Sequence, residues 1–220
     1  MLDYDGPGGM IPPGPGDALD AATGALIRLA AWVAAGSDAD VRDGLDACAA
    51  AAVPDRWIEE LILQSYLFSG FPRTLNAARE WRSRGGSPAA SGQEGFGDGM
   101  ASAWRAAGEQ TCAVVYGRNY RKLRENIRDL HPELDAWMIV EGYGKVLSRG
   151  GLDLGRRELC IVAACAATMQ KRQLHSHLYG ARNAGVAEAV VSASLDALDG
   201  AVTSEALNDA RMLWQRVMRT

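Results

Sequence analysis

The sequence predicts an all-α protein, and three observations support this prediction. Ala, Leu, Arg and Glu are frequent, and these residues form helices readily. Apolar side chains recur at helical spacing rather than in strict alternation. Runs of β-branched residues bounded by turns, which are typical of strands, are lacking. We therefore expect a helical bundle.

Two stretches rich in glycine divide the chain. Residues 1–17 contain GPGGMIPPGPG, which cannot propagate a helix and predicts a flexible or extended arm. Residues 83–99 (SRGGSPAASGQEGFGDG) have the composition of a linker. These breaks predict a first unit at 18–82 and a second unit at 100–220.

Each expected helix shows apolar periodicity and is bounded by turn residues. Pro54, Pro72 and Pro132 suit the first turn of a helix, where a missing N–H costs nothing. In chain order, the expected helices cover residues 18–35, 38–52, 54–69, 72–82, 100–116, 118–130, 132–148, 153–168, 170–184, 186–199 and 203–219.

The two units share an internal repeat, which aligns residues 25–81 with residues 158–214. Each copy has an apolar helix (LIRLAAWVAAG or LCIVAACAATM), an Ala-rich helix, an amphipathic helix and a last helix with LNAAREW or LNDARMLW. Two stacked copies would bury apolar faces that one copy would expose. We therefore expect two tandem repeats.

Composition and charge exclude several classes of protein. The chain has 220 residues, 48% of them hydrophobic, and a net charge of −4, which excludes disorder throughout and disfavours nucleic acid or an anionic membrane as partner. The cationic run at 118–128 (RNYRKLRENIR) is interleaved with acids and aromatics, so we expect a solvated helix face.

The sequence also lacks the usual signs of export. No apolar run approaches the ~20 residues of a membrane span, and the first residues, MLDYDGPGG, do not form a signal peptide. The four cysteines, Cys48, Cys112, Cys160 and Cys165, are far apart in apolar context. We expect a cytoplasmic protein with reduced, buried thiols.

Two motifs of the second unit, GGLDLGRRELCIVAA and QLHSHLYGARNAGV, carry a family resemblance. They resemble the carboxymuconolactone decarboxylase and alkylhydroperoxidase D-like superfamily, from Asp129 to about Trp214, and residues 66–78 resemble the closing part of the same domain. The resemblance implies a compact helical fold and assembly as a trimer or hexamer.

The peroxidase branch of that family carries Glu-x(11)-Cys-x(2)-Cys-x(3)-His. The matching positions here are Glu158, Gln170, Gln173 and His177, so both thiols are replaced. Glutamine cannot ionise or form a sulfenic acid, and Cys160 and Cys165 lie about 140° apart around a helix. The sequence therefore predicts no peroxidase of this type.

The retained residues still predict a polar site. On a helix, Gln170, Gln173 and His177 lie on one face, and the resemblance implies that Glu158 approaches it. His and Glu form a plausible acid–base pair. In the decarboxylase branch, the resemblance implies cofactor-free removal of CO₂ from a carboxylated lactone.

Arg157 and Arg182 are our candidate clamps for substrate carboxylates. The alternatives are that Arg157 pairs with a neighbouring acid, that Arg182 lies on a solvated face, that His177 is a hydrogen-bonded core residue and that Glu158 caps its helix.

Metal and nucleotide sites are not predicted. His175 and His177 lie about 200° apart on a helix and cannot grip one ion. Gly142 and Gly144 fall in an expected helix with no preceding strand, so they do not form a phosphate loop. Trp57, Trp81, Trp137 and Trp214 are expected in the core or in an interface.

Two main hypotheses follow: a cofactor-free decarboxylase or lactone-processing enzyme for a small carboxylated compound, or a non-catalytic oligomeric scaffold or small-ligand binding protein. A thiol peroxidase using Cys165 is the third. The first repeat has Ala25, Ser37, Asp40 and Gly44 at the positions of the polar set, so we expect it to serve as a structural half.

Overall fold

The computed structural model describes residues 18–86 and 99–219. It confirms the all-α prediction, because the regular elements in these ranges are helices and the only β-type pairing is an isolated bridge between Asp199 and Val202. The predicted arm at 1–17 and most of the predicted linker lie outside the described residues.

The helices follow the predicted order, and most ends agree within about two residues. The elements are α1 (Ala21–Ala35), α2 (Asp38–Ala50), α3 (Asp55–Ser83), α4 (Met100–Tyr116), the short 3-10 helix η1 (Gly117–Asn119), α5 (Tyr120–Leu130), α6 (Pro132–Trp137), the π-helix η2 (Met138–Leu147), α7 (Leu154–Ala167), α8 (Lys171–Asn183), α9 (Glu188–Asp196) and α10 (Ser204–Met218).

Short polar side chains define several helix starts. Asp20 and Asp153 accept hydrogen bonds from backbone N–H groups in the first turns of α1 and α7, and Thr203 does the same for α10. Ser37 and Asp40 form a reciprocal capping box at the start of α2. These contacts satisfy N–H groups that have no partner inside the helix.

The predicted helices 54–69 and 72–82 join in α3, which is broken at Gly70. Gly70 has φ +75°, a left-handed conformation that glycine adopts without a Cβ clash. Pro72 then fixes the backbone for the second segment. The sequence therefore located the break correctly.

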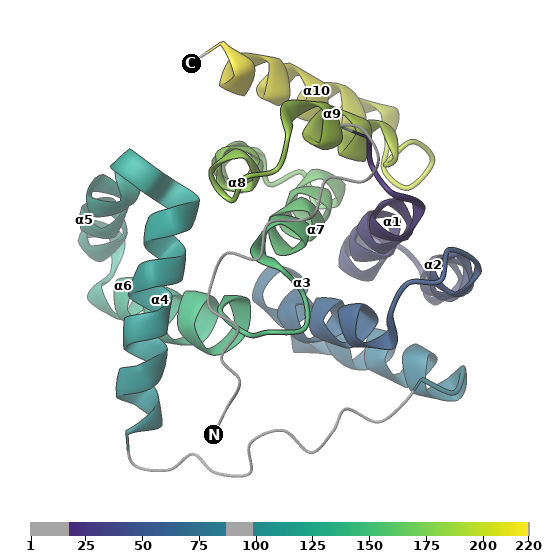
Figure 1. The fold of residues 1–220 in the computed structure, drawn as a ribbon, viewed down its shortest axis with the longest axis horizontal. Coiled ribbons are helices and arrows are strands. Elements are labelled where there is room, and N and C mark those ends of the chain that lie inside the picture. Colours follow the sequence, from purple (N-terminus) through teal and green to yellow (C-terminus); the bar gives the residue numbers. More distant parts are fainter. Residues whose placement is uncertain (1–17, 87–98, 220) are drawn as a thin grey trace.

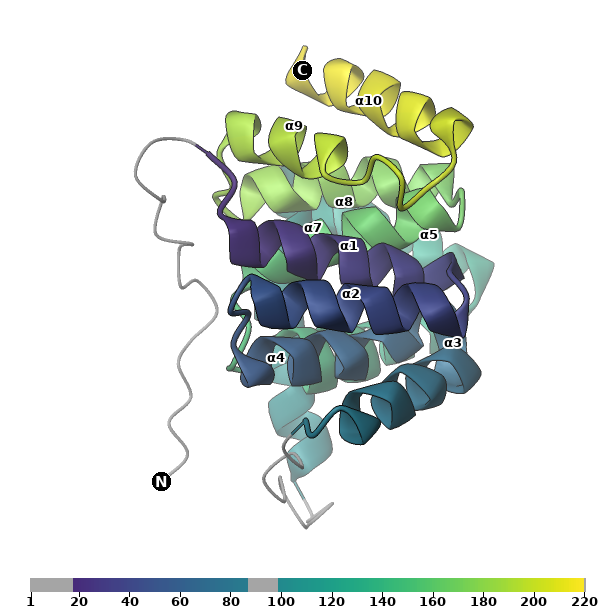
Figure 2. The ribbon, with the colours of Figure 1, turned by 90° about the vertical axis from the view of Figure 1, so that its right-hand side faces the viewer.

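The central helix is α7, in which every residue from Leu154 to Ala166 is buried. It packs against α1, α3 and α8, so it links the N-terminal helices to the C-terminal ones (Figure 1). Figure 2 shows α8–α10 above and α2 and α3 below, with α1 and α7 side by side at mid-height.

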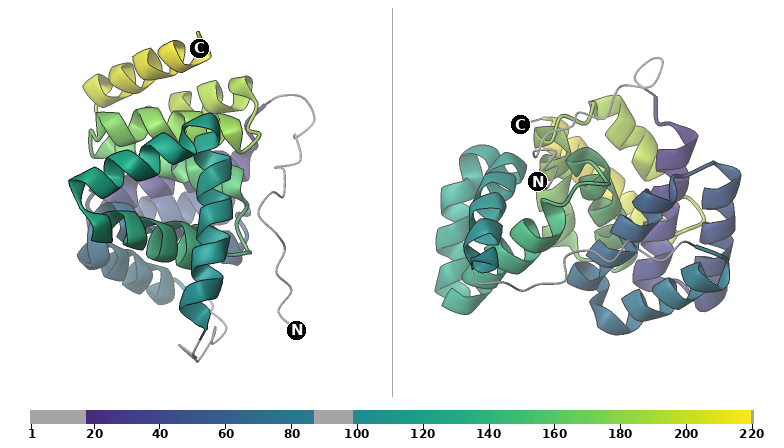
Figure 3. Two further views of the ribbon diagram at one scale, coloured as in Figure 1. Left: turned by 90° about the vertical axis from the view of Figure 1, so that its left-hand side faces the viewer. Right: turned by 60° about the horizontal axis from the view of Figure 1, so that its bottom comes forward.

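A second packing unit is formed by α4 and η2, which cross at very short range. A Cβ on Gly108 would lie 2.1 Å from the Ile139 carbonyl oxygen, and one on Gly144 would lie 2.0 Å from the Trp104 carbonyl oxygen. Only glycine fits at this crossing. In Figure 3, α4 runs steeply across the other helices and covers α8. The sequence predicted one helix over 132–148, but the structure divides it into α6 and the π-helix η2. The spacing of apolar residues could not predict this division, because it does not distinguish α turns from π turns.

The cysteine prediction is confirmed, because all four thiols are buried and free. Trp81 and Trp214 are buried and Trp57 is half-buried, whereas Trp137 is 59% exposed and does not belong to the core of one chain.

Candidate functional site

Glu158 and His177 meet in the interior, between α7 and α8. Glu158 is 0% exposed and His177 is 5% exposed. The Nδ1 atom of His177 lies 2.8 Å from Oε2 of Glu158. An ionised carboxylate only accepts hydrogen bonds, so with Glu158 ionised the Nδ1–H group is the donor. This contact fixes the ring and leaves Nε2 for another partner.

A glycine allows α8 to approach this carboxylate. A Cβ on Gly180 would lie 2.2 Å from Oε2 of Glu158 and 2.8 Å from Cγ1 of Val115 on α4. Any larger residue would displace one of them. Gly180 is therefore part of the site's architecture, although it carries no chemistry.

The pair is enclosed by aromatic and thiol side chains. The Phe68 ring meets the His177 ring edge-on, with centroids 5.7 Å apart, and the rings of Tyr116 and Tyr143 meet at 6.2 Å. Burial raises the pKa of Tyr116 to about 12 and, together with the Glu158 charge, that of Cys165 to about 12. The neighbours of the pair are therefore neutral at ordinary pH.

The sequence analysis did not find these neighbours. The aromatic neighbours come from α3, α4 and η2, which lie far from the Glu–His motif in sequence, whereas Cys165 lies on α7 itself and was already a candidate. Their signal was only that of aromatic and thiol residues at helical core spacing, which does not separate a site wall from ordinary core.

One oxygen of the buried Glu158 carboxylate has no hydrogen-bond partner within residues 18–86 and 99–219. Oε1 of Glu158 is buried and makes no hydrogen bond with the described residues, and Nε2 of His177 likewise makes none with any residue in the ranges the structure describes. Buried polar atoms are nearly always hydrogen-bonded. The unpartnered Oε1 of Glu158 can therefore accept a hydrogen bond from a water molecule or a ligand.

The structure places Gln170 and Gln173 elsewhere. Gln170 is the N-cap of α8 and Gln173 lies in its first turn, and both are exposed. No side-chain hydrogen bond joins either of them to another described residue. The expected common face therefore runs from an exposed first turn to a buried His177, and only its buried end meets Glu158.

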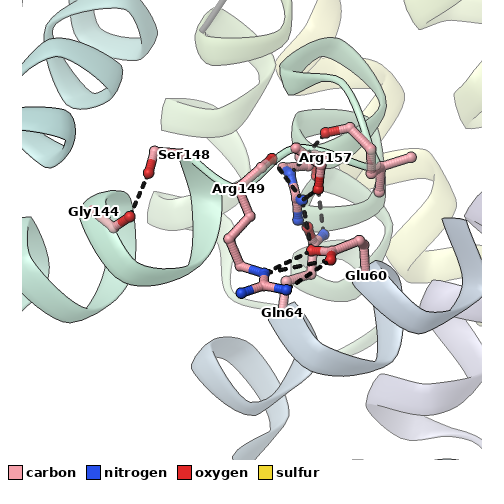
Figure 4. A network of polar contacts seen from close by, with 8 residues as sticks. Glu60, Gln64, Gly144, Ser148, Arg149 and Arg157 are labelled. Carbon is pink, nitrogen blue, oxygen red and sulfur yellow. Dashed lines mark hydrogen bonds and ion pairs between the residues drawn. The ribbon is translucent and has the colours of Figure 1, made fainter. Parts of the chain in front are cut away.

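Arg157 is held by the protein itself. Its guanidinium is fully buried and donates to Glu60 Oε2 (2.8 Å), to Gln64 Oε1 (3.1 Å) and to the carbonyl oxygens of Leu152 and Arg149 (3.0 Å each). Figure 4 shows Glu60 shared between Arg157 and Arg149. This network fastens α3 to α7.

The charges in this network shift each other's pKa values. Burial lowers the pKa of Arg157, and the Glu60 charge opposes that effect. Burial alone would raise the pKa of Glu60, but Arg149 and Arg157 outweigh it and lower that pKa below its ordinary value. The sequence analysis missed Glu60, Gln64 and Arg149, because nothing in the chain pattern pairs residues about ninety positions apart.

Arg182 also contacts protein groups. Its Nη1 donates to the Val217 carbonyl oxygen at 3.0 Å, and its Nε lies 3.4 Å from Glu188. It thereby ties α8 to α10. Neither candidate clamp shares a described contact with Glu158 or His177.

Two further findings concern metals and membranes. Among the residues that the structure describes, no group of three or more His, Cys, Asp or Glu side chains is placed to hold a metal ion. Across the same ranges, no helix combines the length and the apolar character needed to cross a membrane.

The comparisons with known proteins give one family match. Residues 132–216 match the family model described as the Carboxymuconolactone decarboxylase family. The matched segment runs from α6 into α10 and contains both Glu158 and His177. A comparison with curated protein sequences finds no match.

Proposed function

We propose, from the premise that this chain belongs to the carboxymuconolactone decarboxylase family through residues 132–216, that it is a cofactor-free decarboxylase or lactone-processing enzyme. Its substrate in this proposal is a small carboxylated compound. The observation that supports it most is the buried 2.8 Å contact between His177 and Glu158, with Nε2 and one carboxylate oxygen left free.

The chemistry needs a proton donor in a dry site. Decarboxylation breaks the bond between the carboxylate carbon and its neighbour, releases CO₂ and leaves the electron pair on the substrate. That carbanion or enolate then takes a proton. A protonated His177 would give it from Nε2, while Glu158 holds Nδ1–H and stabilises the imidazolium. Solvent then restores the proton to His177.

We propose further that residues 18–82 are a degenerate copy of the family unit and act as a structural half. The chain would assemble as a homo-oligomer, a trimer or hexamer, in the cytoplasm. Exposed large apolar side chains are candidate contacts for such an assembly where they lie together on the surface. They include Phe71, Leu75, Leu130, Leu134 and Trp137.

One observation favours the non-catalytic alternative. The two guanidinium groups expected to bind the substrate bind protein acceptors instead. In this alternative the family fold serves as a scaffold or small-ligand binding protein. A peroxidase has the least support, since burial raises the pKa of Cys112 and of Cys165 to about 12 and only a thiolate attacks peroxide.

The test is to measure turnover of carboxymuconolactone by the wild type and by His177→Ala, with the release of CO₂ as the readout. We expect the variant to lose about 10²- to 10⁴-fold in rate while its helical circular dichroism is retained. Arg172→Ala is the matched control, because Arg172 is exposed on the same helix. A His177→Ala protein with full turnover would overturn the proposal. A wild type without turnover, whose His177→Ala variant only loses about 1–3 kcal/mol of stability, would favour the scaffold.

A further inference from the structure

We propose that a groove between α4, α5 and α8 binds a small planar carboxylate. The groove has a volume of about 240 Å³, which is below the range of pockets for drug-sized ligands and cofactors, about 300–1,000 Å³. Its lining comprises Val115, Tyr116, Asn119, Lys122, Leu123, Asn126, His175, Ser176 and Tyr179. That this ligand is the substrate rests on the function proposed above.

The lining has the chemistry of a site for an aromatic or unsaturated acid. Val115 and Leu123 supply apolar walls, and Tyr116 and Tyr179 supply ring surfaces for a flat body. Asn119 and Asn126 can donate hydrogen bonds from their amides. A carboxylate with a planar apolar body matches both parts of this lining.

Lys122 is the cation of the groove. Nearby, Arg124 and Arg128 are both paired with Asp135, but Lys122 has no ion pair among the described residues. An ammonium without a protein anion is available to a ligand carboxylate.

The surrounding segment adds a positive potential. Residues 117–130 carry five cationic and two acidic side chains, and Asp135 pairs with two of the cations, so an excess of two positive charges remains in a chain with a net charge of −4. A local excess of one sign beside a groove attracts small ions of the opposite sign. The cationic run that we expected to be only a solvated face thus lies beside a cavity.

The groove adjoins the buried acid–base pair. Val115 lines the groove, and its Cγ1 and Oε2 of Glu158 would both contact a Cβ placed on Gly180, at 2.8 Å and 2.2 Å. Tyr116 also lines the groove, its ring meets that of Tyr143, and burial, with a smaller contribution from the Glu158 charge, raises its pKa. Val115 and Tyr116, at the end of α4, therefore lie between the groove and the candidate catalytic pair.

The experiment is calorimetric titration of the purified full chain with benzoate, with sorbate as a second planar acid and benzamide as the uncharged control. We expect both acids to bind and benzamide to bind at least tenfold more weakly. Lys122→Ala should weaken benzoate at least tenfold. Arg121→Ala is the matched control, since it removes a neighbouring exposed cation outside the lining, and it should change affinity less than twofold.

The outcomes separate this proposal from the proposed function. His177→Ala should bind benzoate within twofold of the wild type, because His177 does not line the groove. Benzoate binding that depends on Lys122, in a protein without turnover, would support the groove and refute the enzyme. Turnover that depends on His177, without binding of either acid, would do the reverse. Equal losses in Lys122→Ala and Arg121→Ala would also overturn the groove, since they would show only a diffuse charge effect.

Discussion

The regions α1–α3 and α7–α10 have matching helix caps, turns and indole hydrogen bonds at positions 133 residues apart. Asp20 and Asp153 cap α1 and α7 in the same way. The backbone N–H groups of Val53 and Val186 each donate to the carbonyl oxygen five residues earlier, and the residue before each valine has a positive φ. The indole N–H groups also correspond, since Trp81 donates to Glu59 and Trp214 donates to Ser192. Caps, turns and one indole contact thus recur, which supports the proposed duplication.

The regions differ where the site lies. The counterparts of Glu158 and His177 are Ala25 and Gly44, and a Cβ on Gly44 would lie 2.8 Å from the ring of Trp32. A tryptophan therefore occupies the space beside the position equivalent to His177. In addition, α4 covers α8, whereas the main packing partners of α2 are α1 and α3. The buried polar pair therefore lies where Gly180 leaves room for the Glu158 carboxylate and where α4 covers α8.

The largest expected effect concerns the contact that joins the two regions. Arg157 and Glu60 have Gly24 and Ala193 as their counterparts, so the contact is made once. Glu60→Gln leaves the Arg157 charge buried without its carboxylate, and breaking such a pair costs about 3–5 kcal/mol. Urea unfolding at pH 7 measures this loss.

The matched control is Glu59→Gln, which removes a carboxylate next door that pairs with the partly exposed Arg82. It should cost at most about 1 kcal/mol. Equal losses in both variants would mean that the buried network does not join the regions as described.

The same contact predicts how stability depends on pH. The pKa of Glu60 is lower in the folded chain than its ordinary value of 4.5, so the unfolded chain binds the proton more readily. Its stabilisation is present above about pH 4.5 and is lost as the pH falls through the lower folded pKa. Urea unfolding between pH 7 and pH 3 should show a smaller loss in Glu60→Gln than in the wild type. Parallel pH curves would contradict the assignment.

A smaller effect is expected at Gly180, whose counterpart is the exposed Ala47. Gly180→Ala places a methyl group against Glu158 and Val115 and should cost about 1–3 kcal/mol, despite the better helix propensity of alanine. Adding Glu158→Ala recreates the alanine pair of the first region, so the cost of Gly180→Ala should fall in that background.

The reverse substitution, Ala47→Gly, is the control for this cycle. It changes only helix propensity at an exposed position and should cost about 1 kcal/mol or less. A Gly180→Ala cost that is the same with and without Glu158 would show that the carboxylate does not limit the approach of α8.

The sequence predicted the local features of both regions but not the contacts between distant segments. Helix order, the break near Gly70 and buried thiols all follow from propensity, turn residues and apolar period. The spacing of Glu158 and His177 matched a family motif, and that resemblance predicted that the two side chains meet. By contrast, Glu60 meets Arg157 through the packing of α3 on α7, and no local pattern encodes that. Gln170 was placed on a helix face because helix ends are the least certain part of such predictions.

The smallest effect tests that helix end. The counterparts of Gln170 and Gln173 are Ser37 and Asp40, which form the capping box of α2, whereas Gln170 makes no side-chain cap. Gln170→Ser with Gln173→Asp should give α8 the same box and stabilise the protein by about 0.5–1.5 kcal/mol. That gain corresponds to roughly 1–6 °C in the midpoint of thermal unfolding.

The mirror variant, Ser37→Gln with Asp40→Gln, should lose a similar amount from α2. If neither pair of substitutions moves the midpoint, the two first turns are not equivalent and the comparison fails at this point. Turnover by the stabilised variant tests the glutamines themselves. A variant that gains stability but loses turnover would assign Gln170 and Gln173 to substrate contact. The new residues cap the helix at least as well, so the lost turnover would have to come from another role of the two amides.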